Sequence, residues 1–60
     1  MKPKPINWSA KAEHFVELAA RAAYSAAYAG NDSDREAWEE RAARYDARAT
    51  ECRTAARKAA

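Results

Sequence analysis

Three arginines in the second half of the chain have the spacing expected of a phosphate-binding surface. Arg41, Arg44 and Arg48 stand at i, i+3 and i+7, so that a helix would carry them along one flank. Their planar guanidinium groups can bind two phosphate or carboxylate oxygens at once. The same arginines can instead pair with Glu40 and Glu51, which lie three or four residues away. We expect solvated ion pairs to be their main use and anion binding to be the alternative.

A second basic cluster comes from the two ends of the chain. Lysines and arginines concentrate near both termini, whereas acidic residues gather between positions 32 and 40. The helix dipole favours this arrangement, by about 0.3–1 kcal/mol for each charge. The functional alternative is a site for an anion, a nucleotide or a nucleic-acid phosphate. Arg41, Arg44 and Arg48 are here called the arginine stripe. Together with the stripe, the candidate anion-binding residues are Lys11, Arg53, Arg57 and Lys58.

A third candidate surface combines Arg21 with two tyrosines. Arg21, Tyr24 and Tyr28 repeat the i, i+3, i+7 spacing. Their side chains could stack on a base or sugar, or they could contact a protein partner. Catalysis is not expected, because Cys52 falls among the predicted core positions and His14 on the outer face of its helix. One His and one Cys also make no zinc set, so we expect neither metal nor cofactor.

Charge and hydropathy indicate which partners and which compartment to expect for the chain. The net charge is only +2, which is weak for a dedicated nucleic-acid binder. No apolar run follows the basic start of the chain, and the longest uncharged stretch is half of the roughly 20 residues that a bilayer span needs. We therefore expect a cytoplasmic protein without a membrane partner. It should consist of a flexible basic arm (residues 1–6) and one helical domain (residues 7–60).

Two helices must position these side chains, and their ends are marked in the sequence. The pattern predicts helices at about 8–29 and 34–58. Asn7 or Ser9 can cap the first helix, and Gly30 suits the left-handed position after its end. Ser33 and Glu36 match the capping box that opens a helix.

Apolar residues at steps of four and three run down one face of each predicted helix. This spacing predicts an all-α fold, an antiparallel two-helix hairpin with an Ala-rich heptad seam. Facing positions should sum to about 64, so that every large ring lies over an alanine of the other helix. The seam residues are Trp8, Ala12, Phe15, Ala19, Ala22, Ala26 and Ala29 on the first helix, and Trp38, Ala42, Tyr45, Ala49, Cys52, Ala56 and Ala59 on the second.

Alanine-rich composition predicts that this hairpin does not work alone. Alanine supplies 18 of the 60 residues, so the seam buries little apolar area against the entropy of ordering the chain. Small domains of this kind are often stabilised by oligomerisation. Val16, Ala20, Ala23 and Ala27 form an apolar flank beside the seam. The flank predicts a second contact, most simply with another copy in a four-helix bundle, although alanine can also serve only as a helix former.

Three kinds of function are compatible with these features. The first is a self-associating interaction module that docks on another protein as an adaptor, inhibitor or assembly factor, such as phages and mobile elements encode. The second is an oligomeric protein that sequesters an anionic small ligand, for instance a nucleotide, in Arg/Tyr-lined pockets. The third is a nucleic-acid accessory protein that uses the basic end. We rank them in this order, and none is an enzyme.

Overall fold

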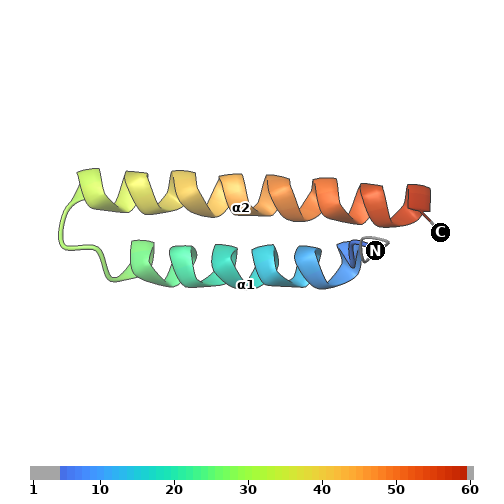
Figure 1. The fold of residues 1–60 in the computed structure, drawn as a ribbon. Coiled ribbons are helices and arrows are strands. Elements are labelled where there is room, and N and C mark those ends of the chain that lie inside the picture. Colours follow the sequence, from blue (N-terminus) through green and yellow to red (C-terminus); the bar gives the residue numbers. More distant parts are fainter. Residues whose placement is uncertain (1–4, 60) are drawn as a thin grey trace.

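The structure, a computed structural model, describes residues 5–59 and shows two helices there, α1 (Trp8–Ala27) and α2 (Asp32–Ala59). They run side by side in opposite directions, joined by a short connection at one end (Figure 1). The predicted all-α hairpin is thus confirmed. Most of the predicted basic arm, residues 1–6, lies outside the described residues.

The start of α1 follows the sequence prediction closely. The side chain of Asn7 accepts a hydrogen bond from the backbone N–H of Ala10 at 3.0 Å. The carbonyl of Asn7 also accepts the first helical hydrogen bond, from the N–H of Lys11 at 3.1 Å. Of the two predicted capping residues, Asn7 is therefore the one that caps α1, because its side chain satisfies an N–H that would otherwise have no partner in the helix.

The connection between the helices differs from its prediction in two respects. Helix α1 ends at Ala27, two residues earlier than expected, and Gly30 does not adopt the left-handed conformation. Nothing lies within 4 Å of the position that a Cβ atom on Gly30 would occupy. Glycine is therefore not required here by backbone conformation or by space. The helix ends through hydrogen bonds from the N–H groups of Tyr28 and Ala29 to the carbonyls of Tyr24 and Ala26, both at 3.3 Å.

The predicted capping box of Ser33 and Glu36 is wrong, because α2 begins two residues earlier. Asn31 caps it: its side-chain oxygen accepts from the N–H of Asp34 at 2.8 Å, and its side-chain nitrogen donates to the Asp34 carboxylate at 3.2 Å. The N–H of Arg35 then bonds to the carbonyl of Asn31 at 3.1 Å. The earlier start therefore retains a side-chain cap, adds helical hydrogen bonds, and places acidic residues in the first turn, where the helix dipole favours them.

Burial in the hairpin follows the predicted seam. Apart from Ala59, which is exposed, the seam residues are buried or half-buried. The buried residues of the described chain are all seam positions, and all are small: Ala12, Ala19, Ala22, Ala26, Ala49 and Cys52. Residues whose numbers sum to about 64 also line the same grooves, as Ser9 and Ala56 do in one and Ala23 and Ala42 in another. The helix faces and their approximate alignment are therefore as predicted.

One detail of the seam differs from its prediction. The rings of Phe15 and Tyr45 stack across the interface, with centroids 6.3 Å apart and planes 27° from parallel. The expectation of a ring over each facing alanine did not include this contact between two rings at the middle of the hairpin. These two positions are about one helical turn apart along the axis, and an aromatic side chain is long enough to bridge that offset.

The hairpin is a single layer of helices. It measures 49 × 22 × 13 Å along its principal axes, and the thinnest dimension is about the diameter of one helix with its side chains. Each helix therefore has two sides that the other helix does not cover. Over the described residues, neither helix combines the length and hydropathy needed to cross a membrane.

Candidate binding surfaces

Each arginine of the predicted stripe already has a neighbour within its own helix. Arg44 forms an ion pair with Glu40 at 2.7 Å, and Arg48 lies 3.8 Å from Glu51. The guanidinium of Arg41 lies over the ring of Trp38, 4.9 Å from its centroid. All these groups belong to α2, and the ion-paired side chains are largely exposed, so each pair contributes little to stability. The geometry matches the row of solvated ion pairs that the sequence favoured.

The basic residues that the structure describes near the open end of the hairpin do not form one cluster. Arg53 and Arg57 line a groove with Ser9 and Glu13 on one side of the hairpin. Lys11 lies over the Trp8 ring, 5.4 Å from its centroid, and lines a different groove that it shares with Arg48. Lys58 lines a third depression, with Thr50 and Thr54 on α2. Of the open-end cations within residues 5–59, the structure therefore brings only Arg53 and Arg57 together.

The two tyrosines of α1 form an exposed aromatic pair. Tyr24 and Tyr28 are 66% and 73% exposed, and their ring centroids lie 4.6 Å apart. Arg21 belongs to the same outer face but pairs with Glu17 at 3.4 Å. The two adjacent rings are a candidate interaction site, because an exposed apolar patch commonly marks one. The surface predicted from Arg21, Tyr24 and Tyr28 is thus accessible as a unit.

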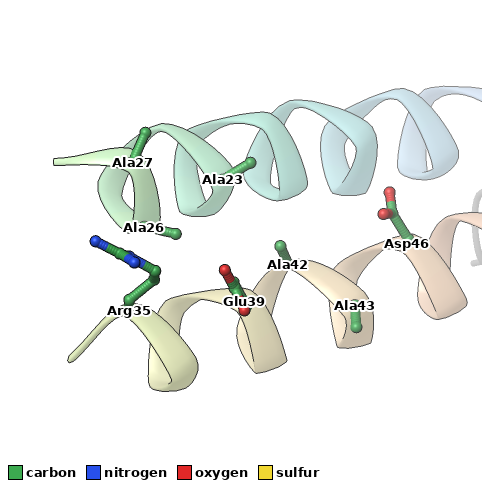
Figure 2. A pocket seen from close by; sticks show the side chains of 8 residues that line it. All are labelled: Ala23, Ala26, Ala27, Arg35, Glu39, Ala42, Ala43 and Asp46. Atoms are coloured by element: carbon green, nitrogen blue, oxygen red, sulfur yellow. The ribbon is translucent and has the colours of Figure 1, made fainter. Parts of the chain in front are cut away.

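The structure has a groove near the loop that the sequence did not predict. It has a volume of about 540 Å³, with alanines of α1 along one wall and charged side chains of α2 along the other (Figure 2). Arg35, Glu39 and Asp46 extend from α2 toward α1 (Figure 2). The seven-residue spacing of Asp32, Glu39 and Asp46 could have revealed this acidic row, since such spacing keeps side chains on one flank of a helix.

Cys52 and His14 lie in different surroundings in the described hairpin. Cys52 is 6% exposed and is a free thiol within the seam. His14 is exposed, with its ring 6.0 Å from that of Phe15. Among residues 5–59, no three His, Cys, Asp or Glu side chains are grouped closely enough to hold a metal ion. The surfaces open to a ligand are therefore shallow and built from one or two helices.

Comparison with protein-family models, with curated proteins and with solved structures finds no match to this chain.

Proposed function

We propose that this protein is a non-catalytic helical interaction module that self-associates and docks on a partner protein. The observation that carries the proposal is the single-layer architecture, which leaves apolar side chains uncovered on both sides of α1. Val16 is 39% exposed on the flank beside the seam, and the exposed Tyr24–Tyr28 pair lies on the outer face. Helical domains normally bury such faces against a second layer.

The exposed surface area is large for a chain of this size. The accessible surface is 5120 Å². A compact monomer of the same mass exposes roughly 3,900 Å², so the chain as a whole exposes roughly 1,200 Å² more. A standard protein–protein interface covers about 800 Å² of each partner. The excess is therefore large enough for one such interface. Self-association into a four-helix bundle is the simplest way to bury it.

The tyrosine pair supports docking on a different protein. Tyrosine is enriched at the positions that dominate binding energy, because it adds a large contact area with little loss of side-chain freedom. Tyr24 and Tyr28 already contact each other, so part of the ordering is complete before a partner binds. The resulting function is that of an adaptor, inhibitor or assembly factor.

The first test separates self-association from partner docking. Sedimentation equilibrium should give a mass at least twice 6.7 kDa at micromolar concentration, with a melting temperature that rises with concentration. For docking, affinity-purified material from the natural host should retain a stoichiometric protein that the double variant Tyr24→Ser, Tyr28→Ser loses. The matched control is Thr50→Ala, Thr54→Ala, an exposed i, i+4 pair on α2. Equal retention by both variants would refute the tyrosine surface.

A second candidate function is binding of a small anion at the open end. Its support is the groove of about 350 Å³ in which Arg53 and Arg57 lie beside Ser9, in the first turn of α1. Guanidinium groups near a helix N-terminus favour phosphate or carboxylate. Glu13 lines the same groove and opposes this charge.

Titration with mono-, di- and cyclic nucleotides and a short DNA duplex, each at two salt concentrations, tests this candidate. Arg53→Gln with Arg57→Gln should abolish binding, whereas Arg44→Gln with Arg48→Gln should not. For duplex DNA, the slope of log K against log salt should be about −0.9 per neutralised phosphate. No binding at low salt would eliminate both the nucleotide and the nucleic-acid functions, since phosphate contacts are strongest there.

A further inference from the structure

One side of the hairpin, here called the groove face, is uncovered along its whole length. The groove near the loop and the groove at the open end both lie on it, the first lined on α1 by Ala23 and Ala26 and the second by Ala12. Spacings of three, four and seven residues align its members along each helix. Those on α1 are Ser9, Val16, Ala20, Ala23 and Ala27, and those on α2 are Asp32, Glu39, Asp46, Arg53 and Arg57.

The groove face changes sign from one end of the hairpin to the other. Its loop half carries the carboxylates of Asp32 and Glu39, and Asp46 lies near the middle. Its open half carries the guanidinium groups of Arg53 and Arg57. Arg35 in the loop half lies 3.7 Å from Asp32 in the same helix, and Glu13 is the corresponding exception in the open half. If a second copy is turned end over end, its basic half therefore faces the acidic half of the first copy, and its acidic half faces the basic half.

We infer that the groove face binds a second copy of this chain in an antiparallel sense, with the two loops at opposite ends of a four-helix bundle. The inference rests on the proposed self-association and specifies its surface and orientation. A two-fold axis perpendicular to the helices places the acidic half of each α2 opposite the basic half of the other. A two-fold axis parallel to the helices would bring both acidic loop ends together.

The side chains of the groove face suit this antiparallel packing. Apart from Glu13, the groove side of α1 carries nothing larger than Val16, so away from Glu13 the two α1 helices can approach to near the short end of the usual 8–10 Å axial separation. Val16 lies near the middle of the hairpin, about level with residue 48 of α2. Residues 39 and 57 are equidistant from that level. A two-fold axis through it therefore sets Glu39 opposite Arg57 of the second copy.

Orientation is tested by a distance measurement between spin labels. The label is attached to Ser33→Cys in a Cys52→Ala background; position 33 is exposed, and alanine keeps the seam position small. In antiparallel copies each label lies fifteen residues from the two-fold axis, on opposite sides of it. At 1.5 Å per residue the two labels are then about 45 Å apart. Copies with their loops together give about 20–30 Å, the width of a bundle plus the labels. The shorter distance would overturn the inference.

Charge reversal tests the pairing itself. Glu39→Arg should raise the dissociation constant of self-association about tenfold, because two symmetry-related attractions become repulsions. Adding Arg57→Glu to the same chain should restore most of the affinity. The matched control, Glu51→Arg, makes the same charge change on the far side of α2 and should leave the constant within about twofold. Equal loss with Glu39→Arg and Glu51→Arg would overturn the pairing.

The outcomes also separate this inference from the proposed function. A chain that stays monomeric at every concentration overturns both self-association and its orientation. Docking through Tyr24 and Tyr28 is scored independently, by the loss of a retained protein in the tyrosine variant. A dimer with the shorter label distance overturns the antiparallel arrangement but leaves self-association standing.

Discussion

Replacing Gly30 with alanine should stabilise the hairpin, although the sequence alone predicts the opposite. Glycine after a helix usually occupies the left-handed conformation, where any other residue costs about 1–2 kcal/mol. Gly30 does not occupy it, and a Cβ atom there would meet nothing within 4 Å. The remaining effect of alanine is to restrict the unfolded chain, which stabilises the folded state by about 0.4–1 kcal/mol.

Unfolding followed by circular dichroism at 222 nm, at a fixed protein concentration, measures this effect. For a domain of this size, the expected gain raises the melting temperature by about 2–8 °C. Urea titration should show a higher midpoint with an unchanged slope. Gly30→Asn serves as the control, because asparagine tolerates the left-handed conformation better than alanine does. If Gly30→Asn proves clearly more stable than Gly30→Ala, or if Gly30→Ala destabilises, Gly30 is left-handed and the described connection is wrong.

Two further substitutions test the seam and the cap. Ala49 is 2% exposed and Ala47 is exposed on the same helix, so Ala49→Leu should destabilise by about 1–3 kcal/mol through overpacking while Ala47→Leu stays near neutral. Equal effects in urea unfolding would mean that the seam is misplaced. Asn31→Ala should cost about 1 kcal/mol by removing the cap of α2, whereas Ser33→Ala should change stability by only a few tenths. The reverse order in thermal unfolding would restore Ser33 as the capping residue.

The sequence by itself determined the helices, the faces that they bury and their direction. Alternating steps of three and four between Trp8 and Ala29, and again after Trp38, specify one apolar face on each helix, because side-chain direction within a helix follows from residue number alone. The cap at Asn7 is equally local, since a capping side chain and the N–H that it satisfies are three residues apart. The candidate arginine pairings within α2 were readable for the same reason.

Only the tertiary structure decided how the two faces meet and what they leave uncovered. The stacking of Phe15 on Tyr45 depends on the axial offset and rotation of one helix against the other, and neither is encoded within a single helix. The choice of Asn31 over Ser33 as the cap is local, but the sequence left it open because both residues have the same capping spacing. The groove face exists only once α1 and α2 are side by side, because its alanines belong to one helix and most of its charges to the other.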